Sequence, residues 1–244
     1  MTTIDNSSLA GALFDAMSNG KALDRNTVAP LDVEAAYKVQ AEVFQRSGRP
    51  LEGLKLSKRA DGTYSAPLFS VIRDDRYKYV DGIVLEVELA FTLQSDLPSR
   101  GEPWTRQEVV AAIGTVSIGA EFVRSRYEGG AGGIFALGLA DSLSNISYAV
   151  GPELSRAILE DPAFDSPLKV LGNGATLYDA PSNHQDIDPV AGVIAYANST
   201  PSPLGFLRKG QVVTTGTLCG AVKIAEPARL EILLDGKTFI IEVA

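Results

Sequence analysis

Residues 84–91 read Val84-Leu85-Glu86-Val87-Glu88-Leu89-Ala90-Phe91. Large apolar and β-branched residues of this kind are typical of a β-strand, so we predict a strand over residues 84–93. Side chains alternate along a strand with a period of two, and Glu86 and Glu88 therefore project from the same face. Two carboxylates among apolar neighbours repel each other and resist desolvation unless a positive charge lies between them. A hard divalent cation would meet that need, because it prefers carboxylate oxygens. The alternative is an amphipathic strand whose two glutamates face solvent.

The composition is that of an ordinary globular protein with an excess of negative charge. The chain has 244 residues, 45% hydrophobic and 21% charged, with a net charge of −8. This length accommodates one large domain or two small ones. The negative charge argues against nucleic acid and anionic membrane surfaces as partners. No apolar run approaches the roughly 20 residues needed to cross a bilayer. The polar N-terminus lacks a signal-peptide pattern, and we expect a cytoplasmic protein.

The single histidine and single cysteine narrow the possible chemistry. They exclude zinc sites rich in histidine or cysteine. One cysteine allows no internal disulfide, which fits a reducing compartment, and Cys219 is more typical of a small buried residue than of a nucleophile. A serine–histidine–acid triad would have to use His184, and no G-x-S-x-G motif accompanies it. The glycine-rich run at 129–133 lacks the Lys-Ser/Thr of a phosphate-binding loop, so we predict a flexible loop there.

Periodicity along the chain predicts a short helical part followed by a largely β body, an α+β fold. The helical N-terminal part covers residues 1–60 and the β-rich catalytic body covers 61–244, together forming one functional unit. Helices are predicted at 7–20, 31–47, 105–112 and 187–198. Strands are predicted at 51–57, 84–93, 114–123, 167–172, 211–225, 228–234 and 237–243, with Asp235-Gly236 as a hairpin turn between the last two.

Several segments in order resemble one family. They are Ala35-Ala36-Tyr37-Lys38-Val39-Gln40, Gly53-Leu54-Lys55-Leu56, Ala66-Pro67-Leu68-Phe69, Glu86-Val87-Glu88, Ile118-Gly119-Ala120-Glu121-Phe122-Val123, Leu171-Gly172-Asn173-Gly174 and Thr215-Gly216-Thr217. This combination is similar to the 2-hydroxypenta-2,4-dienoate hydratases and 4-oxalocrotonate decarboxylases of the fumarylacetoacetate hydrolase superfamily. The match runs from about residue 30 to the end. It implies that superfamily's mixed β-sheet and β-roll body with a helical N-terminal part.

The resemblance implies a metal site. Glu86, Glu88 and Glu121 would bind one Mg²⁺ or Mn²⁺ ion, leaving open positions for the 2-oxo and carboxylate oxygens of a 2-oxo acid. A Lewis acid there would stabilise an enolate, which both hydration and decarboxylation need.

The resemblance also implies catalytic and substrate-binding residues. Burial in an apolar strand predicts a lowered pKa for Lys55, which would let it shuttle a proton near neutral pH. The alternative is a strand-edge lysine whose ammonium group reaches solvent. Asp141 is either a second acid–base group or a helix or turn cap. The remaining candidates, which would bind the substrate carboxylate, are Thr215, Gly216 and Thr217.

The chain departs from the family pattern at three places. Arg124 stands where the family has an aspartate, Ser142 stands where it has an asparagine, and residues 56–59 also differ. Strand alternation would place Arg124 and Arg126 on the face opposite Glu121, so we expect them to form structural or interface salt bridges.

These observations favour a metal-dependent lyase, most simply a hydratase of a 2-hydroxy-2,4-dienoate. The alternatives are a decarboxylase of a vinylogous 2-oxo acid, a catalytically reduced scaffold partner of such an enzyme, and an isomerase acting through the same enolate. The related hydrolases use a histidine placed before the metal ligands, and no histidine precedes residue 86 here. The resemblance further implies a homo-oligomer, or a complex with a related enzyme.

Overall fold

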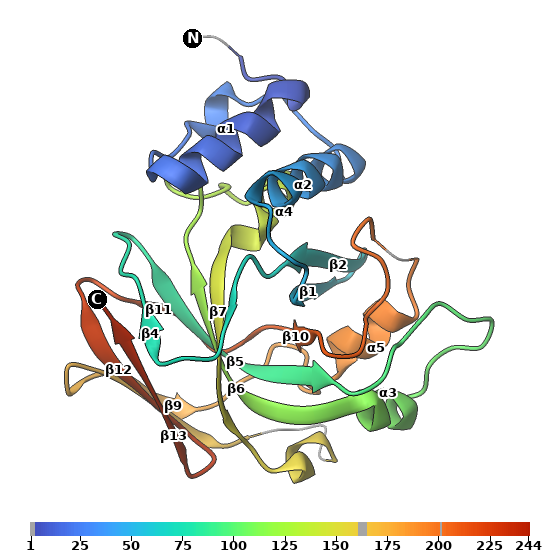
Figure 1. Ribbon diagram of the computed structural model, residues 1–244, viewed down its shortest axis with the longest axis vertical. Helices are drawn as coiled ribbons and strands as arrows, with labels where there is room; N and C mark the ends of the chain where they lie inside the picture. Colours follow the sequence, from blue (N-terminus) through green and yellow to red (C-terminus); the bar gives the residue numbers. More distant parts are fainter. Residues whose placement is uncertain (1–2, 161–164, 201) are drawn as a thin grey trace.

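The computed structural model describes residues 3–160, 165–200 and 202–244, and places a group of helices above a body of two β-sheets (Figure 1). The predicted α+β architecture is confirmed. None of the helices in the described part of the chain is long and apolar enough to span a membrane. The helices within these ranges are α1 (Asn6–Asn19), α2 (Val33–Ser47), α3 (Arg106–Ala112), α4 (Phe135–Ala140) and α5 (Ala191–Ala197), with short 3-10 helices η1 (Arg25–Thr27), η2 (Ser142–Ser144) and η3 (Arg156–Leu159).

The larger sheet carries the candidate site. Its strands are β1 (Gly53–Arg59), β2 (Gly62–Pro67), β3 (Val71–Ile72), β5 (Val84–Leu93), β6 (Ile113–Val123), β7 (Asn145–Glu153), β10 (Val212–Thr214) and β11 (Thr217–Lys223). The order is β2-β1-β10-β5-β6-β7-β3, and β11 also pairs with β5. The sheet is mixed, because β1 and β10 are parallel whereas β5 and β6 are antiparallel. Since β5 lies in the middle of this sheet, acids on it have little access to solvent.

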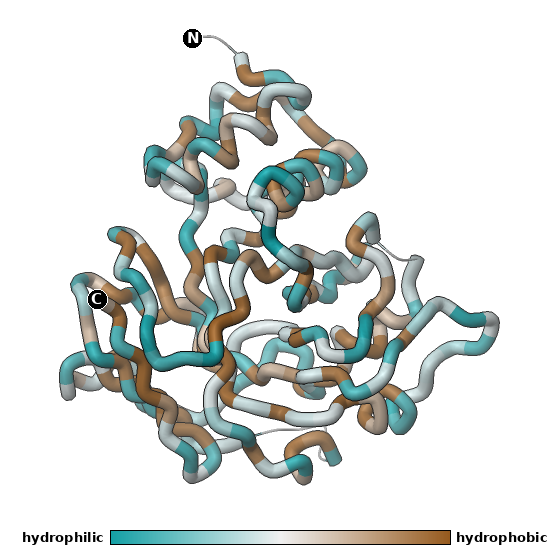
Figure 2. Tube along the Cα trace, viewed as in Figure 1, coloured by the Kyte–Doolittle hydropathy of each residue, from teal (hydrophilic) through white to brown (hydrophobic). Residues whose placement is uncertain are grey.

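The smaller sheet has the order β4-β13-β12-β8-β9. Its strands are β4 (Arg76–Tyr77), β8 (Pro167–Gly172), β9 (Ala175–Pro181), β12 (Ala228–Leu234) and β13 (Lys237–Val243). The predicted hairpin is confirmed: Asp235 and Gly236 join β12 to β13 with φ of 49° and 70°. Buried side chains from both sheets form one core, to which Phe122 and Ile232 belong. Figure 2 shows hydrophobic residues in brown along the strands, interspersed with hydrophilic ones.

The N-terminal helices have well-defined ends and share a core with the middle of the chain. Asp5 and Asp32 cap the N-termini of α1 and α2 with their carboxylates, and a glycine in the left-handed conformation ends each helix. Leu13 and Val39 from these helices pack in one cluster with Leu139 of α4. The N-terminal part is therefore joined to the body by a buried contact. The division at residue 60 stays a prediction.

Two predicted elements differ from the structure. The helix predicted over 187–198 begins only at Ala191, because the preceding loop includes Ile187 at a φ of 61°. The strand predicted over 211–225 is interrupted between β10 and β11, where Gly216 has a φ of 135°. The interruption separates the partners: β10 bridges β1 and β5, whereas β11 pairs with β5. The sequence prediction also missed β2, β3, β4, β7, β9 and α4.

Candidate metal centre

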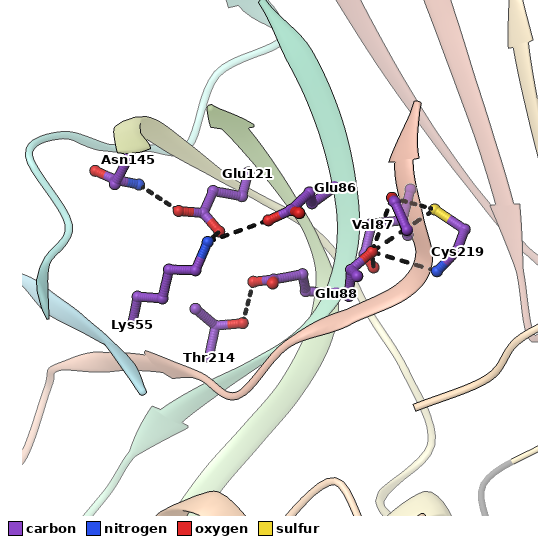
Figure 3. Close-up of polar contacts among 10 residues, drawn as sticks. Lys55, Glu86, Val87, Glu88, Glu121, Asn145, Thr214 and Cys219 are labelled. Atoms are coloured by element: carbon purple, nitrogen blue, oxygen red, sulfur yellow. Dashed lines mark hydrogen bonds and ion pairs between the residues drawn. The ribbon is translucent and has the colours of Figure 1, made fainter. Parts of the chain in front are cut away.

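The register of two central strands brings three carboxylates together (Figure 3). Glu86 on β5 lies directly opposite Glu121 on β6, and Glu88 follows two residues later on β5. Ligand oxygens of the three side chains all lie within 4.8 Å of one another. Glu88 is 0% exposed, so the alternative of a solvated strand face fails for this residue, whereas the Glu86 side chain is 20% exposed; Glu121 is also 0% exposed. The three glutamates that the family resemblance grouped are the three that the fold assembles.

Lys55 lies among these carboxylates. Its Nζ atom lies 2.7 Å from Glu121 Oε2 and donates a hydrogen bond of 3.1 Å to Glu86 Oε2. Burial disfavours the ammonium ion, but the nearby carboxylates of Glu121 and Glu86 outweigh burial and raise the pKa of Lys55. The predicted lowering of this pKa is therefore wrong for the metal-free protein, because an apolar strand was expected to surround the lysine rather than three acids.

The two carboxylate oxygens of Glu88 have different surroundings. Its Oε2 accepts a hydrogen bond from Thr214 Oγ1 on β10. Its Oε1 is buried and has no hydrogen-bond partner among the described residues. Burial and the neighbouring Glu121 carboxylate raise the pKa of Glu88 well above its usual range. The sequence prediction missed Thr214, which directly precedes Thr215 and faces Lys55 across β1 and β10.

Tyr148 on β7 lies beside the same carboxylates. Its hydroxyl is buried without a hydrogen-bond partner in the described structure, and its pKa is raised well above the usual value by burial and by the charge of Glu88. Space for the ring comes from Gly119, which lies opposite Glu88 across the β5–β6 ladder. A Cβ atom at position 119 would lie 1.9 Å from the Tyr148 hydroxyl. A glycine is therefore required at this position for the observed packing.

The residues at the centre fit a hard divalent cation. Three carboxylates and one ammonium group carry a formal charge of −3 + 1 = −2, which one divalent ion neutralises. The unpaired Oε1 of Glu88 is the kind of buried atom that a ligand would satisfy. All the atoms of the cluster that could coordinate a metal ion are carboxylate oxygens, which suit Mg²⁺ or Mn²⁺.

A pocket of about 330 Å³ opens onto the cluster. All three predicted substrate-binding residues, Thr215, Gly216 and Thr217, line it. The Thr215 hydroxyl donates to the Pro189 carbonyl at 2.7 Å, and the Thr217 hydroxyl to the Gly220 carbonyl at 3.0 Å. The two hydroxyls thus hold the surrounding loops. The other residues lining the pocket are Lys55, Leu56, Ser57, Glu86, Glu88, Gly138, Leu143, Ser144 and Gln185.

One wall of the pocket comes from the loop before α5, which sequence patterns did not indicate. His184 in this loop is 4% exposed, and its Nε2 lies 3.3 Å from Thr215 Oγ1. Burial lowers the pKa of His184 and favours the neutral ring. Asp186 forms an ion pair of 3.1 Å with Lys58 on β1. These contacts attach the loop to the larger sheet and bring Gln185 to the pocket.

Asp141 does not line this pocket. Its carboxylate accepts hydrogen bonds of 3.0 Å from Ser125 Oγ and from the Arg126 backbone N–H, and forms an ion pair of 3.4 Å with the Arg126 guanidinium. The structural salt bridge expected of Arg126 is confirmed, whereas Arg124 donates to the Gly20 carbonyl at 2.8 Å. The prediction that strand alternation places Arg124 and Arg126 on the face opposite Glu121 was wrong, because β6 ends at Val123 and neither arginine lies in the strand. The catalytic role of Asp141 stays a prediction.

Asn145 is a residue of the centre that the sequence prediction missed. Its Nδ2 donates a hydrogen bond of 2.8 Å to Glu121 Oε1, and its Oδ1 accepts one of 2.9 Å from the Phe69 backbone N–H. Asn145 is fully buried at the start of β7. It therefore fixes one oxygen of Glu121 and leaves the other directed at Lys55.

Solved structures with the same architecture include characterised enzymes. A 4-oxalocrotonate decarboxylase from Pseudomonas putida, solved with magnesium and adipate, matches 100% of both chains with a TM-score of 0.80 and 20% identity. A protein from Yersinia pestis assigned to the fumarylacetoacetate hydrolase family matches 80% of this chain and 93% of its own, with a TM-score of 0.57 and 20% identity. The chain has the fumarylacetoacetate hydrolase fold.

Other structures of the fumarylacetoacetate hydrolase fold hold a metal and a 2-oxo acid. A maleylpyruvate hydrolase from a Sphingobium species, solved with manganese and pyruvate, covers 80% of this chain and 71% of its own, with a TM-score of 0.52 and 19% identity. No protein-family model and no curated protein sequence matches this chain. At these identities the likeness establishes the fold, and any activity has to be argued from the site.

Proposed function

We propose that this protein is a divalent-metal-dependent lyase of the fumarylacetoacetate hydrolase superfamily, and that it decarboxylates a vinylogous 2-oxo acid of the 4-oxalocrotonate type. The observation that carries the proposal is the convergence of Glu86, Glu88 and Glu121 on Lys55 at the base of a pocket. Full-length similarity to a decarboxylase with the same fold supports it.

The three glutamates would hold one Mg²⁺ or Mn²⁺ ion. When bound, the ion would supply a Lewis acid that stabilises negative charge on the oxygen of a 2-oxo acid. Asn145 and Thr214 keep two of the carboxylates oriented, through hydrogen bonds to Glu121 and Glu88 respectively. The backbone at Gly216 lies at the pocket surface, where it would contact the substrate carboxylate.

Lys55 would donate the proton that the reaction requires. In decarboxylation the bond to the departing carboxylate breaks, and its electron pair moves through the double bond to the 2-oxo oxygen. That oxygen then takes up a proton, for which Lys55 Nζ is the donor closest to the carboxylate cluster. Its side chain is 13% exposed, so water competes little for the ammonium group.

Hydration of a 2-hydroxy-2,4-dienoate is the second candidate, and the charge of the pocket favours it. Among the described residues that line the pocket, Lys55 is the one cation, and two glutamates already engage it. A dicarboxylic substrate brings a second carboxylate that would need another positive partner, whereas a monocarboxylic dienoate does not.

Turnover of a substrate panel tests the proposal. The panel contains 4-oxalocrotonate, 2-hydroxypenta-2,4-dienoate and an acylpyruvate, each with Mg²⁺ and with chelator, and with three proteins: wild type, Glu88→Ala and Glu226→Ala. The last variant is a control, because Glu226 is exposed and outside the pocket. We expect carbon dioxide release from 4-oxalocrotonate that requires both Mg²⁺ and Glu88.

The other outcomes separate the alternatives. Loss of the dienoate chromophore without carbon dioxide release would replace decarboxylation by hydration. Cleavage of the acylpyruvate would indicate a hydrolase. Absence of both turnover and Mg²⁺ binding in the wild type would refute a metal-dependent enzyme and favour the scaffold alternative.

A further inference from the structure

A left-handed turn forms part of the pocket wall. The three residues of η2, Ser142, Leu143 and Ser144, have φ values of 51°, 51° and 65°. Residues other than glycine rarely adopt this conformation, and three in succession are strained unless their surroundings hold them. Leu143 and Ser144 line the pocket, and the next residue, Asn145, donates to Glu121. The conformation of this turn therefore bears on both the pocket and a metal ligand.

The guanidinium group of Arg126 holds both ends of the turn. Its Nη1 donates to the Asp141 carbonyl at 3.2 Å, directly before the turn, and its Nη2 donates to the Asn145 carbonyl, directly after it. Arg126 is 7% exposed, so these are buried charge-assisted hydrogen bonds. The Asp141 carboxylate in turn accepts from the Arg126 backbone and pairs with its guanidinium.

We propose that Arg126 and Asp141 form a positioning pair, which keeps residues 142–144 in the left-handed conformation and thereby fixes Asn145 against Glu121. Neither residue touches the pocket, so both act through the turn. The inference rests on the proposed function only in taking Glu121 as a metal ligand. It does not depend on which reaction the protein catalyses.

Mn²⁺ affinity of the folded protein is the test, measured by calorimetry without substrate. Arg126→Lys keeps the positive charge but loses the rigid guanidinium fork, whose two nitrogens each donate to one of the carbonyls. We therefore expect Mn²⁺ affinity to fall about 10–100-fold, as for loss of other groups that orient metal ligands. Asp141→Asn keeps a hydrogen-bond acceptor and serves as the second variant if Arg126→Lys does not fold. We expect a smaller loss in the same direction.

Rescue distinguishes positioning from general support of the fold. Glycine adopts the left-handed conformation without strain, so adding Ser142→Gly to Arg126→Lys should restore most of the Mn²⁺ affinity. Adding Ser142→Ala removes the same hydroxyl but keeps the Cβ atom, and should restore nothing. Arg156 is the matched control: it donates to the Val110 and Gly114 carbonyls at the other end of β6, and Arg156→Lys should leave Mn²⁺ affinity unchanged.

Three outcomes would overturn the positioning role. The first is wild-type Mn²⁺ affinity in folded Arg126→Lys and Asp141→Asn. The second is equal rescue by Ser142→Gly and Ser142→Ala. The third is an equal loss of Mn²⁺ affinity in Arg156→Lys. Failure of the lyase activity alone would look different, because the wild type would then bind Mn²⁺ yet turn over no substrate of the panel. A wild type that binds no Mn²⁺ would overturn both the proposed function and the positioning role.

Discussion

Replacing Glu88 by glutamine should make the metal-free protein more stable. Glutamine has the shape of glutamate without its charge, and Glu88 is fully buried, with one oxygen that has no hydrogen-bond partner in the described part of the chain. Burial and Glu121 raise its pKa well above the usual range, so the ionised form is disfavoured in the folded protein. Relieving a buried group of this kind is worth about 1–3 kcal/mol. We expect the free energy of unfolding to rise by about that amount near pH 8.

The same substitution should weaken metal binding. A neutral amide replaces one of three carboxylate ligands, and the formal charge of the cluster falls from −2 to −1 (−2 + 1). Loss of a group that merely orients a ligand lowers metal affinity about 10–100-fold, so loss of the ligand itself should exceed about 100-fold. Stability and Mn²⁺ affinity would therefore move in opposite directions, which a simple folding defect cannot produce.

Urea unfolding in chelator and Mn²⁺ calorimetry measure the two effects. Glu86→Gln is the matched control, because its side chain is 20% exposed and pairs with Lys55. It should lose Mn²⁺ affinity to a similar degree but gain little or no stability. A Glu88→Gln protein that is less stable than wild type in chelator, or that binds Mn²⁺ as tightly as wild type, would refute the reasoning.

Three further predictions concern the same strands. Gly119→Ala should lower the free energy of unfolding by about 1–3 kcal/mol, since its Cβ atom would overlap the Tyr148 hydroxyl. Gly101→Ala should change it little, because no atom of the residues that the structure describes would lie within 4 Å of the new Cβ; urea unfolding compares the two variants. The metal-free protein should melt at a lower temperature near pH 8 than near pH 5. The raised pKa of Glu88 means that folding takes up a proton. The stability that this group contributes is therefore complete below its ordinary pKa of 4.5 and is lost as the pH rises through its folded pKa. A series of melting curves in chelator that shows no fall in melting temperature, or the same fall in Glu88→Gln, would contradict this. Lys55→Met should destabilise the metal-free protein by about 3–5 kcal/mol, because it leaves buried carboxylates unpaired. In the Lys55→Met protein, Mn²⁺ at a hundredfold excess over its Kd should restore about 2.7 kcal/mol of the free energy of unfolding, which melting curves can follow.

Local patterns predicted the parts of this protein that depend on short stretches of chain. The period of a strand placed Glu86 and Glu88 on one face, and the Asp235-Gly236 turn was read directly from its residues. The helix predicted over 105–112 is present as α3, with Thr105 as its N-cap residue. Each of these features requires only residues within a few positions of one another.

Features that depend on register between distant strands could not be predicted in this way. Local sequence patterns do not place Glu121 opposite Glu86, and only the family resemblance grouped Glu121 with Glu86 and Glu88 as a metal ligand. Without it Lys55 was expected in apolar surroundings, which gave the wrong direction for its pKa. Asn145 gave no local signal, because its role depends on a hydrogen bond to a residue 24 positions away.

The departure at Ser142 gains a physical meaning from the structure. The family that the sequence resembles has an asparagine at this position, and asparagine tolerates the left-handed conformation better than serine does. Serine therefore increases the strain of the turn, by a share of the roughly 1–2 kcal/mol per residue that this conformation costs. The buried hydroxyl of Ser142 offsets none of it, since it has no hydrogen-bond partner among the described residues.

The strained turn at residues 142–144 lies next to the buried carboxylates of Glu88 and Glu121, and both features argue against a protein that serves only as a scaffold. A scaffold would gain stability from a neutral residue at position 88 and a glycine at position 142, because neither change disturbs the sheet pairing that holds the body together. The chain instead keeps two buried glutamates, Glu88 and Glu121, and holds the left-handed turn with a buried arginine. Buried charge of this kind reduces stability unless a ligand compensates it, and a divalent ion at the three carboxylates would do so. The physical argument for metal binding is therefore the stability that the metal-free protein loses by burying these carboxylates.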